Sequence, residues 1–222
     1  MGIFAISDLH LSFGNNKPMD IFGEGWENHY LKIEKDWLEK VTADDIVILA
    51  GDFSWATYLE ETIQDFEYLN KLPGKKLLLK GNHDYWWTTV TKMNNFLKDN
   101  NFNNIEFIYN NSIEYNGYSI CGTRGWSDTL DNKYDDEKIL AREYQRLEYS
   151  LNQAKTDNII VVLHFPPNEK FIEIMKKYNV KICIYGHLHG KLKPEDIIPN
   201  NNGIKYYLTS ADKVDFKLIE IK

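Results

Sequence analysis

Five of the six histidines in this chain stand in short clusters with aspartate, asparagine or glycine. The clusters supply carboxylate and amide oxygens together with imidazole nitrogens, and none contains a cysteine. This donor set suits Mn, Fe or Zn rather than a structural zinc site of the cysteine-rich kind. The clusters are Asp8 and His10; Gly51 and Asp52; residues 81–84; His164; and residues 186–189.

Seven side chains in these clusters are candidate metal ligands, which is more than one ion can bind. Seven donors suit two ions with one bridging carboxylate. Each residue alone also has a plain structural explanation, such as a turn former or a buried histidine with a backbone partner. The five clusters together favour a metal site, because unpaired buried aspartate and histidine would be costly. The candidates are Asp8, His10, Asp52, Asn82, His164, His187 and His189.

A short apolar run precedes each cluster and predicts a strand covered on both faces. Amphipathic stretches at 27–41 and 58–72 predict helices between the first three strands. This alternation indicates an α/β fold with right-handed crossovers, in which the carboxyl ends of the strands share one edge. The predicted strands are residues 2–6, 45–50, 75–80, 158–163 and 181–185.

The remaining segments predict further strands and a long helix. Residues 105–123 resemble two or three strands, with "YNGY" as a hairpin turn, and residues 203–221 alternate as a second hairpin would. Residues 133–156 predict a charged, solvated helix. His29, the histidine outside the clusters, is expected to be an ordinary surface residue.

The composition limits the possible functions. The 222 residues suit one domain spanning 1–222, and the net charge of -7 argues against nucleic acid as the substrate. Neither a signal peptide nor a membrane span is apparent, so a cytoplasmic protein is expected. Cys121 and Cys183 lie in apolar stretches and are expected to be buried free thiols. The sequence identifies no protein partner.

Five blocks of the sequence resemble the signature blocks of the calcineurin-like metallophosphoesterases. They are "DLH" at 8–10, "GDF" at 51–53, "GNHD" at 81–84, "HFPP" at 164–167 and "GHLH" at 186–189. The resemblance implies a four-layer α/β/β/α sandwich of two mixed sheets, with a dinuclear metal site at the carboxyl ends of the strands. It also implies that one ion is bound by Asp8, His10 and His189, that the other is bound by Asn82, His164 and His187, and that Asp52 bridges them.

The resemblance further implies a hydrolase that attacks phosphorus with a metal-bridging hydroxide. His83 would protonate the leaving oxygen, and Asp84 would orient His83. The expected substrate is a small-molecule phosphate ester, with monoester and diester both open, and the expected cofactors are two divalent ions, Mn first and Fe or Zn as alternatives. The competing interpretation is a non-catalytic scaffold of the same fold.

Two segments, 85–87 and 122–128, could supply substrate specificity. Arg124 lies between two glycines, and we expect it either to contact a substrate phosphate or to pair with a nearby acid. Trp86, Trp87 and Trp126 could stack on a substrate group or pack in the core.

Overall fold

Two five-stranded sheets form the centre of the protein in the computed structural model, which describes residues 1–15, 17–127, 133–193, 196–200 and 202–222. The first sheet has the order β10-β1-β2-β3-β4, and the second has the order β5-β6-β7-β8-β9. The first contains β1 (Ile3–Ile6), β2 (Ile46–Leu49), β3 (Lys75–Leu79), β4 (Ile105–Ile108) and β10 (Ile219–Glu220). The second contains β5 (Ser112–Tyr115), β6 (Tyr118–Gly122), β7 (Ile159–Val162), β8 (Ile182–Tyr185) and β9 (Lys205–Leu208).

Both sheets are mixed. Strands β1 to β4 are parallel and β10 joins β1 antiparallel, whereas β6 to β9 are parallel and β5 joins β6 antiparallel. The expected strand runs at 2–6, 45–50, 75–80, 158–163 and 181–185 correspond to β1, β2, β3, β7 and β8. The "YNGY" hairpin is also confirmed, because Tyr115 pairs with Tyr118 and both Asn116 and Gly117 have positive φ.

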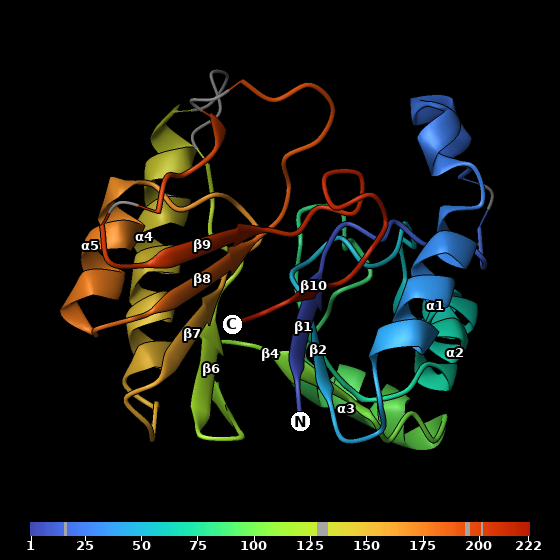
Figure 1. The fold of residues 1–222 in the computed structure, drawn as a ribbon, viewed down its shortest axis with the longest axis horizontal. Coiled ribbons are helices and arrows are strands. Elements are labelled where there is room, and N and C mark those ends of the chain that lie inside the picture. The colour runs from blue at the N-terminus through green and yellow to red at the C-terminus, as the bar shows by residue number, and fades with distance from the viewer. Residues whose placement is uncertain (16, 128–132, 194–195, 201) are drawn as a thin grey trace.

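Helices cover the outer face of each sheet, so that the layers run helix, sheet, sheet, helix (Figure 1). This arrangement confirms the expected four-layer sandwich. On the side of the first sheet lie α1 (His29–Lys40), α2 (Ile63–Lys71) and α3 (Val90–Asp99), while α4 (Lys133–Leu151) and α5 (Glu169–Lys177) lie on the side of the second. Short 3₁₀ helices occur at Asp20–Phe22, Glu24–Trp26 and Leu59–Thr62.

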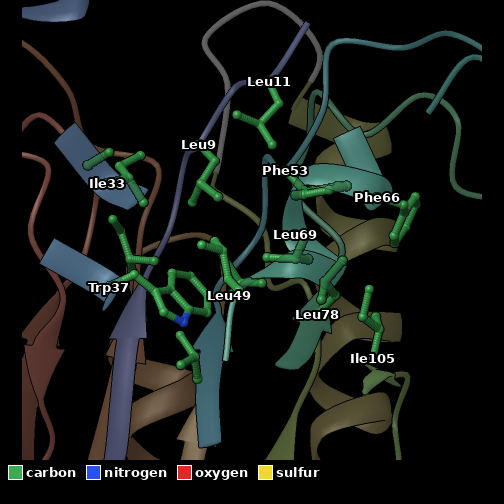
Figure 2. Close-up of a cluster of buried hydrophobic side chains, with 14 of the residues drawn as sticks. Leu9, Leu11, Ile33, Trp37, Leu49, Phe53, Phe66, Leu69, Leu78 and Ile105 are labelled. Carbon is green, nitrogen blue, oxygen red and sulfur yellow. The ribbon is translucent and has the colours of Figure 1, made fainter. Parts of the chain in front are cut away.

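Alternating residues of each strand enter different cores, which explains the nearly continuous apolar runs. In β2, Leu49 packs with the helices of the first layer, as Figure 2 shows, whereas Ile48 packs between the two sheets. Leu9 and Leu11 extend the first core beyond the end of β1, on either side of His10 (Figure 2). The buried side chains beside His10 therefore fix the course of a segment that carries predicted ligands.

Two sequence-based expectations about the fold are wrong. The tail does not form a hairpin, because β9 joins β8 in the second sheet and β10 joins β1 in the first. His29 is buried, and its ring nitrogens lie 3.1 Å from the Trp26 carbonyl oxygen and 2.8 Å from that of Leu9. Cys121 and Cys183 are buried free thiols, as expected.

Candidate metal centre

Each predicted ligand lies just beyond the carboxyl end of a strand. The first sheet contributes ligands after β1, β2 and β3, and the second contributes ligands after β7 and β8. Because these ends meet at one edge of the sandwich, residues separated by up to 181 positions become neighbours. The ligands following the strands are, in order, Asp8 and His10, Asp52, Asn82, His164, and His187 and His189.

Two overlapping groups of these side chains could each hold a metal ion. Asp8, His10 and His189 form one group, and Asp8, Asp52 and His164 form the other. Within each group the possible ligand atoms all lie within 4.8 Å of one another. The shared Asp8 places the two groups side by side, as a dinuclear site requires.

Asp52 links the two groups, and Asn82 links the second group to His187. Asp52 Oδ2 lies 3.5 Å from His164 Nε2 in its own group and 3.8 Å from His10 Nε2 in the other. Asn82 Oδ1 lies 2.7 Å from His164 Nε2 and 2.9 Å from His187 Nδ1. All seven predicted ligands therefore converge on one place.

The backbone at this place is strained. Four non-glycine ligands have left-handed φ values: 58° at Asp8, 47° at His10, 54° at Asp52 and 71° at His187. Each such conformation costs on the order of 1–3 kcal/mol and persists only where the surroundings hold it. Strain concentrated on the ligands is typical of a functional site.

Two glycines lie directly against the carboxylates of two predicted ligands. A Cβ added to Gly81 would lie 2.1 Å from Asp52 Oδ1, and one added to Gly186 would lie 2.5 Å from Asp8 Oδ2. Neither distance is compatible with a side chain at the glycine. The glycines in "GNHD" and "GHLH" thus provide the space that the two carboxylates occupy.

The electrostatics of these side chains fit bound cations. Burial lowers the pKa of His10 to about 3 and that of His164 to about 4, so both imidazoles are neutral and able to ligate near pH 7. Burial and the nearby charges of Asp84 and Asp8 raise the pKa of Asp52. His10 Nδ1 is buried and has no hydrogen-bond partner in the part of the chain that the structure describes. Divalent cations would compensate the crowded carboxylates and use the neutral imidazoles.

A family comparison agrees with this geometry. A model of the family described as calcineurin-like phosphoesterase matches residues 1–191. The chain belongs to this family. Its membership supports a metal-dependent hydrolase of phosphoester bonds, and the convergent donors supply a place for the metals.

Solved structures with the same fold include three that span nearly the whole phosphoesterase. A protein of unknown function from Aquifex aeolicus, AQ665, is 22% identical with a TM-score of 0.55, covering 99% of this chain and 95% of that one. The phosphopantetheinyl hydrolase PptH from Mycobacterium tuberculosis is 14% identical with a TM-score of 0.57. The match covers 99% of this chain and 95% of the PptH chain. The protein TT1561 of Thermus thermophilus is 12% identical with a TM-score of 0.55, covering 99% and 97%. A comparison with curated protein sequences gave no match.

Asp84 lies among backbone N–H groups. Its buried carboxylate accepts hydrogen bonds from four of them and from Trp86 Nε1. Among the described residues, His83 Nδ1 has no hydrogen-bond partner, so the orienting role expected of Asp84 stays a prediction. Asp84 joins two loops, because its backbone donors are Asp52, Phe53, Ser54 and Gly81.

His83 lies beside the predicted ligands. Its backbone N–H donates to Asp52 Oδ1 at 2.7 Å, and its ring is 5.7 Å from that of His10. Burial lowers the pKa of His83, and the negative charge of Asp8 partly opposes this shift. A bound phosphate anion would likewise favour the protonated imidazole.

Three residues that contact the site were not found from the sequence. The Trp55 ring lies 4.7 Å from that of His10 and 4.6 Å from that of His83. Asp212 Oδ1 lies 2.8 Å from His189 Nδ1, and His29 contacts the carbonyl between Asp8 and His10. Trp55 could have been predicted to lie near the site, because it follows "GDF" closely in the sequence. No local sequence pattern indicates that Asp212 lies there.

The tryptophans at 86, 87 and 126 mainly pack inside the protein. Trp86 and Trp87 belong to the core beneath the first helical layer, which removes Trp86 as a stacking surface for substrate. Trp126 lies 5.3 Å from the Phe165 ring, and the Arg124 guanidinium lies 4.6 Å from the Trp126 ring. Residue 128 of the 122–128 segment lies outside the described residues.

None of the described helices is long and apolar enough to cross a membrane.

Proposed function

We propose that this phosphoesterase hydrolyses small-molecule phosphomonoesters or phosphodiesters with two divalent ions, of which Mn is the first expectation and Fe or Zn are alternatives. The observation that carries the proposal is the convergence of seven donors that follow five strands. Five of them form two groups that share Asp8, and Asn82 contacts both His164 and His187. Carboxylate, amide and imidazole donors without a thiolate suit these ions.

The proposed chemistry divides between the ions and the chain. The seven predicted donors would hold the two ions, which would supply charge neutralisation at the phosphoryl oxygens and a water molecule of lowered pKa as the nucleophile. His83 donates a proton to the leaving oxygen from its position beside His10 and Asp52. Asp84 acts as a positioning residue through the backbone of the two loops, and Arg124 contacts a substrate phosphate.

The test uses metal-stripped protein reloaded separately with Mn, Fe or Zn, assayed on aryl phosphate monoesters and diesters. We expect chelation to abolish turnover and at least one ion to restore it. Asp52→Asn should lower turnover by at least about 100-fold, since even residues outside the ligand shell contribute 10- to 100-fold to metal sites. Asp157→Asn is the matched control, because Asp157 is exposed and precedes the amino end of β7, at the opposite end of that strand from His164.

Two outcomes would contradict the proposal. Turnover that survives complete chelation would exclude metal-dependent hydrolysis. Tight metal binding without turnover of either ester class would instead favour the non-catalytic scaffold. The retention of all seven donors together with His83 speaks for the enzyme.

A further inference from the structure

A small cavity of about 220 Å³ lies where the ends of β3, β4 and β6 meet helix α4. Three basic side chains line it, namely Lys80, Arg124 and Arg146, together with one acid, Glu143. We call it the cation cavity. Trp87 forms part of its wall, and the Trp87 Nε1 is a buried donor that finds no hydrogen-bond partner among the described residues.

The charges around the cation cavity do not balance. Three cations against one carboxylate leave a net charge of +2 if all four groups are ionised. The Glu143 carboxylate is already engaged, because it accepts hydrogen bonds from Thr123 Oγ1 at 2.5 Å and from Gly125 N at 3.1 Å, and also pairs with Arg146. Within the described part of the chain, Lys80 and Arg124 lie in no ion pair with a carboxylate. An anion would complete this set of charges.

Two residues that line the cation cavity are backbone neighbours of predicted metal ligands. Lys80 lies two residues before Asn82. The Arg124 carbonyl oxygen accepts a hydrogen bond from the backbone N–H of His164 at 2.9 Å. The cavity therefore lies beside the candidate metal centre, where a second group of a bound substrate would be placed.

The size of the cavity limits what it can bind. Pockets for drug-sized ligands measure about 300–1,000 Å³, so a volume of about 220 Å³ suits a phosphate better than a nucleoside. Guanidinium groups bind phosphate through paired N–H donors, and a lysine adds a point charge.

We propose that the cation cavity binds a second phosphate group of the substrate, remote from the phosphorus that is hydrolysed. This inference rests on the proposed function and narrows it to substrates that carry at least two phosphate groups. Arg124 and Lys80 are the principal ligands of that second phosphate, whereas Arg146 mainly neutralises Glu143.

The first experiment measures binding of inorganic phosphate to the metal-free full chain by calorimetry. It isolates the cation cavity, because without metal ions the metal centre is not expected to bind phosphate. Lys80→Met and Arg124→Gln should each weaken binding about 10-fold, as expected for a hydrogen bond to a charged group. Arg142→Gln is the matched control, since Arg142 is an exposed arginine one helical turn before Arg146. Thermal unfolding of each variant verifies that it is folded.

The second experiment compares metal-loaded proteins on two aryl phosphates that differ only in a second, non-hydrolysed phosphate. Lys80→Met should raise KM for the bisphosphorylated substrate about 10-fold, change KM for the simple substrate less than about 2-fold, and leave kcat unchanged for both. Equal effects on both substrates would overturn the assignment of a second phosphate. So would phosphate binding that is equally strong in the two variants and in Arg142→Gln.

The two experiments separate the inference from the proposed function. The protein could bind phosphate through Lys80 and Arg124 and yet hydrolyse no ester. That result would support the cavity as a phosphate site and contradict only the hydrolase assignment. Hydrolysis without any preference for a second phosphate would support the hydrolase assignment and contradict the cavity as a phosphate site.

Discussion

Three consecutive residues in "GNHD" have three different partners. The Asn82 side chain contacts two histidines of the metal centre, and the Asp84 carboxylate binds the backbone of the neighbouring loop. Between them, His83 donates its backbone N–H to Asp52, and among the described residues its buried Nδ1 has no hydrogen-bond partner. Because Nδ1 is buried, a proton exchanged with a bound molecule beside the predicted ligands would pass through Nε2.

Replacing His83 by asparagine tests this role at the scale of one residue. We expect kcat/KM to fall by about 10²- to 10⁴-fold, the usual contribution of a general acid, with metal content unchanged. The loss should be smaller for an ester whose leaving group needs no protonation, such as 4-nitrophenyl phosphate, than for an alkyl phosphate. Equal losses on both esters would assign His83 to positioning rather than to proton transfer.

At the scale of elements, the Asp84 carboxylate makes several of the hydrogen bonds that join the segments following β2 and β3. Asp84, after β3, accepts from the backbone N–H groups of three consecutive residues after β2. The first of these residues is the predicted bridging ligand Asp52. The position of that ligand therefore depends on a residue that is not itself a ligand.

Asp84→Ala should destabilise the protein by about 3–5 kcal/mol, because it leaves several buried N–H donors without an acceptor. Chemical denaturation of the metal-free protein measures this change. Asp157→Ala, at an exposed position, should change the free energy of unfolding by less than about 0.5 kcal/mol. A small effect at Asp84 would mean that water or another group can replace its carboxylate.

At the scale of the whole molecule, the metal centre lies where the two sheets meet. Asp8, Asp52 and Asn82 follow strands of the first sheet, while His164 and His187 follow strands of the second. Metal bound to both sets would join the two halves of the sandwich. Metal binding should then stabilise the protein as a whole rather than one loop.

Metal addition should accordingly raise the free energy of unfolding by about 2.7 kcal/mol per site at a concentration 100 times Kd. Titration of the metal-free protein with Mn, followed by thermal unfolding, measures the gain. Asp52→Asn should lose most of it, and Asp157→Asn should retain it. Hydrogen exchange should slow in strands of both sheets; protection confined to one sheet would contradict a centre that joins them.

Most of the sheet framework could be predicted from the sequence. The apolar runs at β1, β2, β3, β7 and β8 are nearly continuous because both faces of these strands are buried, and that pattern is visible locally. Helices α3 and α5 were not anticipated. The predicted hairpin at residues 203–221 is wrong, because local alternation identifies a strand but not the sheet that it joins. That sheet depends on which sheet edge the strand reaches.

For the site, the predicted metal donors could be chosen from the sequence, because residue type and place after a strand are both local properties. The groups that surround those donors are visible only in the folded chain. In the folded chain, Asp84 accepts hydrogen bonds from the backbone after β2, and Asp212 contacts His189. His29 contacts the backbone carbonyl between Asp8 and His10. The fold also brings Lys80, Arg124 and Arg146 around one cavity. Such contacts join distant segments, so their partners are set by the packing of sheets and helices and leave no local pattern in the chain.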